Sequence, residues 1–261
     1  MQAPQGDRLK DKVAIVTGGA SGIGEGICLE FASQGAAIAI ADLNDEKAQA
    51  VVEKVQALNV KAQAYNVDIV DAPRVREVVE AVQKDFGTID ILVNCAGISL
   101  FKPVYEFTDE EWQRIRSVNL DGPWNVSRAV VPVMIKKKYG KIVNISSAAG
   151  TRATPHASPY STAKHGVLGL TRTFAVDLGE FGINVNCICP ASVDSPLLRA
   201  TVSEAYCQAM VDRLPLGRLG KASDISKAAL FLVSDDAEWI TGVILPVDGG
   251  LTCCNYRHHS E

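Results

Sequence analysis

Short apolar runs alternate with longer amphipathic runs along most of the chain. Apolar runs of a strand's length occur at 12–18, 36–44, 60–68, 89–97, 140–146, 183–190 and 242–250. Runs with helical spacing of apolar residues occur at 27–35, 44–59, 71–87, 108–138 and 159–180. Strands that are apolar throughout and alternate with helices are typical of a parallel sheet covered on both faces. The pattern therefore predicts one α/β domain over residues 1–261, with a doubly wound parallel sheet of about seven strands.

Several predicted helices carry signals at their ends or interior. Asn44 is a suitable N-cap for the helix after the second apolar run, whose first turn is acidic. Thr108 opens the sequence TDEEW, which is typical of a helix start. Pro123 and Pro132 fall inside the run 108–138, so we expect that helix to bend or to be interrupted.

The segment 191–222 departs from the regular alternation. It contains several prolines and glycines, its middle is amphipathic, and it follows the sixth apolar run. Ligand crevices in doubly wound sheets open beyond the carboxyl ends of the strands. Two interpretations follow: a lid that closes over a substrate, or an ordinary surface excursion.

Composition narrows the classes of function. Apolar residues make up 47% of the 261 residues and charged residues 21%, which suits a globular protein with a substantial core. A net charge of −4 provides no electrostatic reason to expect nucleic acid or an anionic membrane as a partner. No apolar run approaches the ~20 residues of a membrane span, and the polar start lacks the apolar core of a signal peptide. We therefore expect a cytoplasmic protein whose seven cysteines are mostly buried and reduced.

A glycine-rich turn lies between the first predicted strand and the first predicted helix. Gly18, Gly22 and Gly24 permit a tight turn and a close backbone approach, and a helix N-terminus favours a pyrophosphate. Asp42 ends the second predicted strand, 18 residues after Gly24, where a carboxylate can accept hydrogen bonds from ribose hydroxyls. It would repel a 2′-phosphate, and Leu43 offers no cation, so NAD is favoured over NADP. The alternative is that Asp42 only caps the following helix.

Tyr160 and Lys164 are candidates for proton transfer. Residues four apart share one face of a helix. A nearby ammonium favours phenolate over phenol and can lower a tyrosine pKa from about 10, which makes a proton donor and acceptor for an alcohol. Taken alone, the pair is more typical of a solvated helix face.

Taken in order along the chain, the motifs resemble those of the short-chain dehydrogenase/reductase family, over nearly the whole chain. They are Thr17-Gly18-Gly19-Ala20-Ser21-Gly22-Ile23-Gly24, Asp68, Asn94-Cys95-Ala96-Gly97, Asn119, Ser147, Tyr160, Lys164, and Pro190 with Val193 and Ser195. The resemblance implies a Rossmann-like fold and nicotinamide-dependent oxidation or reduction.

The resemblance implies four catalytic residues. Tyr160 would be the general acid/base that protonates a carbonyl oxygen or deprotonates an alcohol. Lys164 would lower the pKa of Tyr160 and hydrogen-bond the nicotinamide ribose. Ser147 would hold the substrate oxygen, and its place 13 residues before Tyr160 favours it over Ser146. Asn119 would help hold a water that links Lys164 to solvent. Outside the family pattern, Ser147 and Asn119 could be plain caps.

The resemblance also implies where NAD binds. Asp68 and the backbone of Ile69 would meet the adenine, while Asn94 and Gly97 would shape the floor under the adenosine ribose. Asn94 could instead only pin neighbouring strands. Val193 and Ser195 would meet the nicotinamide carboxamide. The predicted cofactor set is Gly18, Ser21, Gly22, Ile23, Gly24, Asp42, Leu43, Asp68, Ile69, Asn94, Ala96, Gly97, Tyr160, Lys164, Pro190, Val193 and Ser195.

Three positions depart from the family pattern. Cys95 stands where a second asparagine is usual, Ala191 where a glycine follows the proline, and Ser195 where threonine is commoner. We interpret Cys95 as a packing change and expect Ala191 to alter how the predicted lid hinges, while Ser195 keeps the hydroxyl. None of these changes removes a proton-transfer residue.

The substrate pocket is expected after Gly97, between Ser147 and Tyr160, and in the segment 191–222, which together also contain Phe101 and Lys102. The predicted substrate contacts are Ser99, Ser147, Arg152, His156, Tyr160 and Arg199. Their polar and cationic character suggests a small polar or anionic substrate, such as a sugar, polyol or hydroxy-acid derivative.

We therefore predict an NAD-dependent oxidoreductase that acts on a secondary alcohol or the matching ketone. One alternative is a 3-oxoacyl thioester reductase using NADP, against which Asp42 and Leu43 count. Another is a non-catalytic nucleotide-binding subunit, against which the intact catalytic set counts.

The tail 251–261 is rich in cysteine and histidine. Cys253, Cys254, His258 and His259 are metal-capable, but their spacing matches no structural zinc pattern, so a disordered or docked tail is preferred and no metal is predicted. Members of the resembled family commonly form tetramers, which implies a homotetramer, or a homodimer, here.

Overall fold

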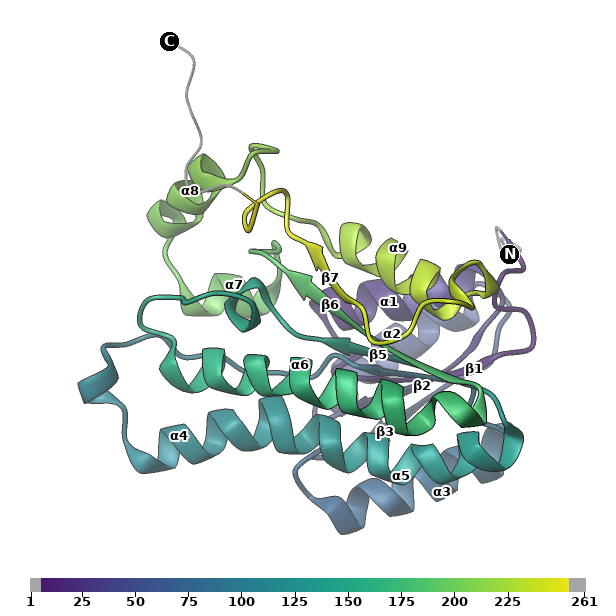
Figure 1. The fold of residues 1–261 in the computed structure, drawn as a ribbon. Coiled ribbons are helices and arrows are strands. Elements are labelled where there is room, and N and C mark those ends of the chain that lie inside the picture. Colours follow the sequence, from purple (N-terminus) through teal and green to yellow (C-terminus); the bar gives the residue numbers. More distant parts are fainter. Residues whose placement is uncertain (1–5, 254–261) are drawn as a thin grey trace.

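The protein is built on one parallel sheet with helices on both faces (Figure 1), seen in a computed structural model that describes residues 6–253. The strands run in the spatial order β3-β2-β1-β4-β5-β6-β7, and every neighbouring pair is parallel. Their bounds are β1 (Val13–Thr17), β2 (Ala37–Asp42), β3 (Ala62–Asn66), β4 (Ile91–Asn94), β5 (Gly140–Ile145), β6 (Ile183–Pro190) and β7 (Ile244–Val247). The predicted doubly wound sheet is confirmed.

The helices follow the predicted alternation. They are α1 (Gly22–Ser33), α2 (Asp45–Gln56), α3 (Ala72–Phe86), α4 (Asp109–Arg116), α5 (Gly122–Lys137), α6 (Ser158–Leu178), α7 (Pro196–Thr201), α8 (Glu204–Arg213) and α9 (Ala222–Val233). Short turns are η1 (Val104–Glu106), η2 (Ser117–Asp121, a π-helix), η3 (Ala148–Gly150), η4 (Gly179–Phe181) and η5 (Asp235–Ala237). Of these helices, α7 and α8 lie in the predicted excursion, and α9 was not predicted.

Two helix starts match their sequence signals. The Asn44 side chain accepts a hydrogen bond from the backbone N–H of Lys47 at 2.9 Å, which makes Asn44 the N-cap of α2. Thr108 and Glu111 form a reciprocal capping box at the start of α4. Each cap satisfies backbone donors that a helix leaves unpaired in its first turn.

The predicted interruption of the run 108–138 lies at the π-helical turn η2, immediately before Pro123 in the first turn of α5. Pro132 lies inside α5, which continues to Lys137, so this proline does not interrupt the helix, and the other expected outcome, a bend, stays a prediction. Proline leaves the carbonyl four residues earlier without its helical donor. That residue, Arg128, is exposed, so water can satisfy the carbonyl.

The alternation of side chains along the strands produces two cores, one on each face of the sheet. One cluster, which includes Val16 and Ile225, joins the sheet to α1, α2 and α9. The other, which includes Ile15 and Val130, joins it to α3, α5 and α6. Figure 1 shows the same two layers, with α3, α5 and α6 covering one face and α1, α2 and α9 the other.

The order of the strands places a crevice at the carboxyl ends of β1 and β4. The chain goes from β1 outward to β2 and β3, and then crosses back to β4 on the other side of β1. The connections after β1 and β4 therefore diverge, which is where doubly wound sheets bind ligands. Within residues 6–253, no helix is both long and apolar enough to cross a bilayer.

Candidate active site

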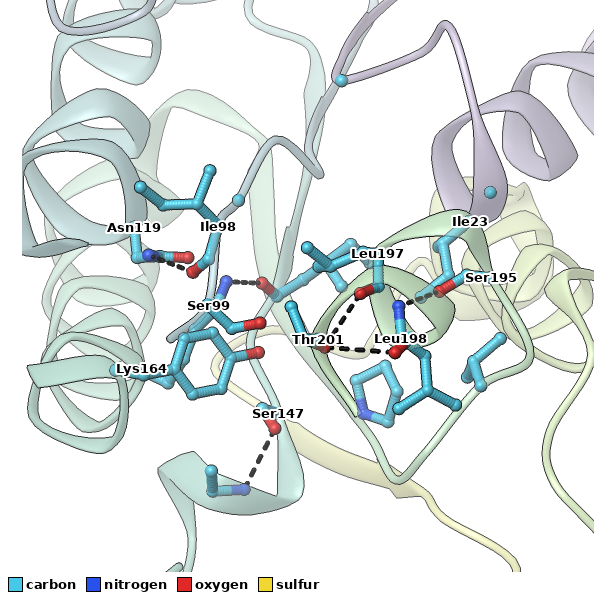
Figure 2. A pocket seen from close by; sticks show the side chains of 18 of the residues that line it. Ile23, Ile98, Ser99, Asn119, Ser147, Lys164, Ser195, Leu197, Leu198 and Thr201 are labelled. Carbon is cyan, nitrogen blue, oxygen red and sulfur yellow. Dashed lines mark hydrogen bonds between the residues drawn. The ribbon is translucent and has the colours of Figure 1, made fainter. Parts of the chain in front are cut away.

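A cavity of about 450 Å³ opens at the carboxyl ends of the central strands. It is lined by the turn after β1, the end of β2, the segments after β3, β4, β5 and β6, and residues of α4, η2, α6, α7 and α8. Figure 2 shows Asn119 and Lys164 on one side of this cavity and Ile23, Ser195 and Leu197 on the other.

Most of the predicted site residues line this single cavity. They are Gly18, Ser21, Gly22, Ile23, Gly24, Asp42, Leu43, Asp68, Ile69, Ala96, Gly97, Ser99, Asn119, Ser147, Arg152, Tyr160, Lys164, Pro190, Val193 and Ser195. Three predicted residues do not line it: Asn94, His156 and Arg199. The wall thus collects residues that are far apart in sequence but follow adjacent strands.

The glycine loop leaves backbone exposed on the cavity wall. Gly18 and Gly22 have φ of +65° and +57°, in the region that favours glycine. A Cβ on Gly24 would lie 2.0 Å from the carbonyl oxygen of Gly18, so no side chain fits there. The N-terminus of α1 lies behind this turn, and it favours an anionic ligand. The loop therefore suits the pyrophosphate of a dinucleotide.

Asp42 joins the glycine loop to the end of β2. One carboxylate oxygen accepts from the backbone N–H of Ala20 at 3.0 Å, and the other from the N–H of Asn44 at 2.9 Å. Asn44, not Asp42, is the side-chain cap of α2, so the alternative of a simple helix cap does not describe Asp42. The carboxylate places negative charge on the cavity wall beside Leu43, whose side chain is exposed.

Asp68 marks the far end of the cavity. Its carboxylate accepts from the backbone N–H of Val70 at 3.1 Å and lies 3.5 Å from the Arg114 guanidinium. The carbonyl of Ile69 accepts from the side chain of Asn125 at 3.1 Å, which holds this turn against α5. The position suits contacts with an adenine ring.

Asn94 lies beneath the cavity rather than on its wall. It is buried, and its amide donates to Asn144 Oδ1 at 2.8 Å and to Ser127 Oγ at 3.0 Å. Asn144 in turn donates to Thr171 Oγ1 at 2.9 Å. Asn94 therefore ties β4 to β5 and α5, as the strand-pinning alternative expects, while its contribution to the floor under the adenosine ribose stays a prediction.

Tyr160 and Lys164 lie on the first turns of α6, at the cavity wall. The ammonium lies 5.7 Å from the centroid of the Tyr160 ring and donates to the carbonyl of Ile145 at 2.9 Å. Burial raises the pKa of Tyr160, while hydrogen bonding with Ser147 acts in the opposite direction. Burial also lowers the pKa of Lys164. Desolvation is thus the largest influence on the phenol and acts to raise its pKa, while the expected lowering by Lys164 stays a prediction.

Two neighbouring serines have different partners. The Ser146 hydroxyl donates to the carbonyl of Lys164 at 2.9 Å, so its proton is engaged within the core. The Ser147 hydroxyl accepts from the N–H of Ala149 at 3.1 Å, which caps η3 and leaves its own proton available. Ser147 therefore caps a turn, as one interpretation of the sequence expects, and its hydroxyl also interacts with Tyr160; its contact with a substrate oxygen stays a prediction.

Asn119 lies in the π-helical turn η2. Its amide donates to the carbonyls of Ile98 and Ile115, each at 2.8 Å, while its Oδ1 is buried without a hydrogen-bond partner. A Cβ on Gly97 would lie 2.8 Å from this oxygen and 3.6 Å from Lys164 Nζ, so both polar atoms flank one glycine. An unpaired buried acceptor beside an ammonium is a suitable site for a bridging water.

The substrate side of the cavity differs in part from the prediction. Arg199 is exposed, and its guanidinium binds Asp194 at 2.8 Å and also Glu204, so it is held within the excursion itself. His156 is exposed, with a φ of +60°. The lining residues that sequence reasoning missed include Tyr206, Met210 and Arg213 of α8. Their spacing of four and three places them on one helix face, which is the signal that could have identified them.

Two of the departures from the family pattern, Cys95 and Ser195, can be explained from their surroundings in the structure. Cys95 lines the cavity, and burial raises the pKa of its thiol to about 12, so it stays neutral. Ser195 is the N-cap of α7, where its hydroxyl accepts from the N–H of Leu198 at 3.3 Å (Figure 2). No metal-binding cluster occurs among residues 6–253; Cys254, His258 and His259 of the predicted tail lie outside that range.

The sequence and the fold both match known oxidoreductases. A family described as enoyl-(acyl carrier protein) reductase matches residues 18–252. A 3-oxoacyl-(acyl-carrier-protein) reductase of Thermotoga maritima is 38% identical over 244 residues, which cover 94% of this chain and 99% of the relative. A D-threitol dehydrogenase of Mycolicibacterium smegmatis is 37% identical over 245 residues, with 94% of both chains covered.

Solved structures agree with this assignment. Levodione reductase matches with a TM-score of 0.91 and 31% identity, over 94% of this chain and 99% of that one. The match in sequence and fold extends over the same cavity that holds the glycine loop, Ser147, Tyr160 and Lys164. The chain therefore belongs to the short-chain dehydrogenase/reductase family of oxidoreductases.

Proposed function

We propose that the protein is an NAD(H)-dependent oxidoreductase that transfers a hydride between nicotinamide and a small polar secondary alcohol or ketone. The observation that carries the proposal is one cavity with two ends of different chemistry. One end has the glycine loop and the Asp42 carboxylate, and the other has Tyr160 beside Ser147 and Lys164. A relative named D-threitol dehydrogenase and a structural neighbour named levodione reductase support a small polar substrate.

The residues on the wall suit a dinucleotide. The backbone of the glycine loop would hold the pyrophosphate, Asp42 the adenosine ribose, and Asp68 with Ile69 the adenine. Val193 and Ser195 would meet the carboxamide. When bound, the nicotinamide would supply or accept the hydride, and its oxidised ring would bring a positive charge.

Proton transfer is the work of the protein's own residues. The Ser147 hydroxyl would orient the substrate oxygen, and the Tyr160 phenol would give a proton to that oxygen in reduction or take one in oxidation. Lys164 is buried and close to the phenol, so it would stabilise the phenolate formed when Tyr160 has given its proton away. The unpaired Asn119 Oδ1 would hold a water that returns a proton by way of Lys164.

The preference for NAD can be tested by binding. We expect NADH to quench protein fluorescence at lower concentration than NADPH, because the Asp42 carboxylate on the cavity wall would repel a 2′-phosphate. Replacing Asp42 with Ala should weaken NADH binding by roughly 10-fold and reduce the preference. Asp45→Ala, at the first residue of α2 and outside the cavity lining, is the matched control. Tighter binding of NADPH by the unaltered protein would refute this part of the proposal.

A second candidate is reduction of a 3-oxoacyl thioester with NADPH. The name of the Thermotoga maritima relative favours it. A panel of sugars, polyols, hydroxy acids and a 3-oxoacyl thioester, read at the absorbance of reduced nicotinamide, separates the two candidates. Exclusive turnover of the thioester would replace the first proposal by the second. No turnover of any compound would instead favour a non-catalytic nucleotide-binding subunit.

We also propose that segment 191–222 closes over the substrate and that the protein is a homotetramer or homodimer. Residues of α7 and α8 already contribute to the cavity wall. Large apolar side chains are exposed on two faces, at Trp124 and Val176 of α5 and α6, and at Phe231 and Trp239 near α9. Two separate apolar faces suit two kinds of subunit contact. A stable, active monomer in gel filtration would contradict the assembly.

A further inference from the structure

The charged residues on the cavity wall are divided unevenly between its two ends. The lining carboxylates are Asp42 and Asp68, both on the nucleotide side, and the lining cations are Arg114, Arg152, Lys164 and Arg213. No carboxylate of the lining comes from the η3 to α6 segment or from α7 and α8. The substrate end therefore presents positive charge without a lining counterion.

Two of the four cations are already accounted for. Arg114 lies 3.5 Å from Asp68, and Lys164 donates to the carbonyl of Ile145 beside Tyr160. Arg152 and Arg213 form no ion pair with any residue of the described range 6–253. The Nε of Arg152 is shielded from solvent and has no hydrogen-bond partner within the described residues. Shielding a guanidinium nitrogen from water without a hydrogen-bond acceptor costs free energy, and an acceptor on a bound ligand would offset that cost.

Both arginines extend from segments that are anchored near Ser147. The backbone N–H of Arg152 donates to the carbonyl of Ala148 at 3.2 Å, directly after η3. Arg213 ends α8, and the next residue, Leu214, is buried in one small cluster with Ala148 and Leu251. The turn that presents Ser147 and the end of α8 therefore share one packing unit. That unit holds in place the backbone from which both arginine side chains extend.

We infer that Arg152 and Arg213 form a subsite for an oxyanion at the far end of the substrate, a carboxylate, phosphonate or sulfonate. This inference rests on the proposed function and narrows its substrate class to short anionic hydroxy or keto compounds. Guanidinium groups bind such oxyanions with paired, charge-assisted hydrogen bonds. Leu197, Val202 and Met210 supply apolar wall in the same cavity, which suits a short carbon chain between the two polar ends.

The same arrangement selects against a neutral polyol. A neutral substrate would cover two guanidinium groups without giving them a negative partner, and desolvated unpaired charge is costly. An anionic substrate satisfies both groups at once. We therefore expect discrimination between an acid and its neutral ester, even when the two have the same carbon chain and the same ketone.

The experiment compares matched acid and ester pairs. The probes are 3-oxobutanoate, 4-oxopentanoate and 5-oxohexanoate, each against its methyl ester, followed by the phosphonate and sulfonate analogues of the best length. The variants are Arg152→Gln and Arg213→Gln. The control is Arg76→Gln, which removes the same charge from an exposed position on α3 outside the lining. NADH affinity and the urea midpoint are measured for each variant to verify that it is folded.

We expect the unaltered enzyme to prefer the acid of one chain length by at least about 10-fold in kcat/KM. Each of Arg152→Gln and Arg213→Gln should lower kcat/KM for that acid by roughly 10- to 100-fold, because each removes charge-assisted hydrogen bonds. Turnover of the ester should change by less than about threefold. Arg76→Gln should have the same kcat/KM as the unaltered protein for both the acid and the ester.

Equal losses for acid and ester in the variants, or no preference for any acid in the unaltered protein, would overturn the subsite. Failure to reduce any ketone, neutral or anionic, would overturn the proposed function instead. The subsite is then judged by binding alone. Butyrate should raise the melting temperature of the NADH-loaded protein but not that of Arg152→Gln, and the absence of a shift in the unaltered protein would refute it.

Discussion

Replacing Gly24 with alanine tests whether the glycine loop is shaped by close backbone contact. Gly24 lies in the first turn of α1, and an added Cβ would lie 2.0 Å from the carbonyl oxygen of Gly18 and 2.7 Å from its carbonyl carbon. Ordinary van der Waals contact for a Cβ begins at 3.4 Å. The atoms in the way are backbone, so a change of rotamer cannot relieve the overlap.

The expected losses of stability and of NADH affinity in Gly24→Ala follow from how far the backbone must move to relieve the overlap. The N-terminus of α1 and the loop before it must separate by more than about 1 Å, which in a packed interior costs about 1–3 kcal/mol or more in unfolding free energy. The same displacement moves the backbone that would hold the pyrophosphate. We therefore expect NADH affinity to fall by on the order of 10- to 100-fold, which is about 1.4–2.8 kcal/mol.

The assay pairs urea unfolding, followed by circular dichroism, with NADH titration. Gly169→Ala is the matched control, because Gly169 lies inside α6 and a Cβ there would meet nothing within 4 Å. Alanine at that helical position should stabilise the protein by about 0.5–1 kcal/mol and leave NADH affinity unchanged. If Gly24→Ala kept both the urea midpoint and the NADH affinity of the unaltered protein, the close-contact account of the loop would be refuted.

Three further outcomes follow from the site. Tyr160→Phe should lower kcat by roughly 100- to 10,000-fold while NADH affinity stays within about twofold; parallel loss of both would indicate a structural role instead. Burial raises the pKa of Tyr160, so its contribution to stability is present below about pH 10 and is lost as the pH rises above that value. The urea midpoint of the unaltered protein should therefore fall more steeply than that of Tyr160→Phe from about pH 9 to pH 11, and parallel curves would contradict this. Asn144→Ala leaves the buried amide of Asn94 and hydroxyl of Thr171 without a shared partner, so unfolding should become easier by about 1–3 kcal/mol; a loss under about 0.5 kcal/mol would argue against the network.

The sequence alone determined the architecture and most of the nucleotide side of the cavity. Strand-length apolar runs that alternate with amphipathic ones left a doubly wound parallel sheet as the arrangement that buries both faces. Once that sheet is known, residues that directly follow its strands, such as Gly18, Asp42 and Gly97, must meet at one edge. The spacing of Tyr160 and Lys164 on one helix placed them together for the same reason.

Only the tertiary structure decided how side chains from separate segments are paired. Arg199 looked suited to a substrate, but Asp194 and Glu204 neutralise it. By contrast, Arg213, which the sequence did not single out, lines the cavity and has no ion-pair partner among residues 6–253. Asn94 ends β4, and its amide nitrogen is directed into the core, towards Asn144. The partners of these side chains depend on which groups from distant segments come within a few ångströms of each other.

The pKa of Tyr160 also depends both on a feature that the sequence predicts and on one that only the structure shows. Helical periodicity predicts the neighbour, Lys164, and so predicts a lowered pKa. The packing of α6 against the sheet also removes water from both groups, and this desolvation raises the pKa of Tyr160 and lowers that of Lys164. Spacing along a helix is a local property that the sequence contains, whereas burial is produced by the whole fold, so only the structure could show that both groups are desolvated.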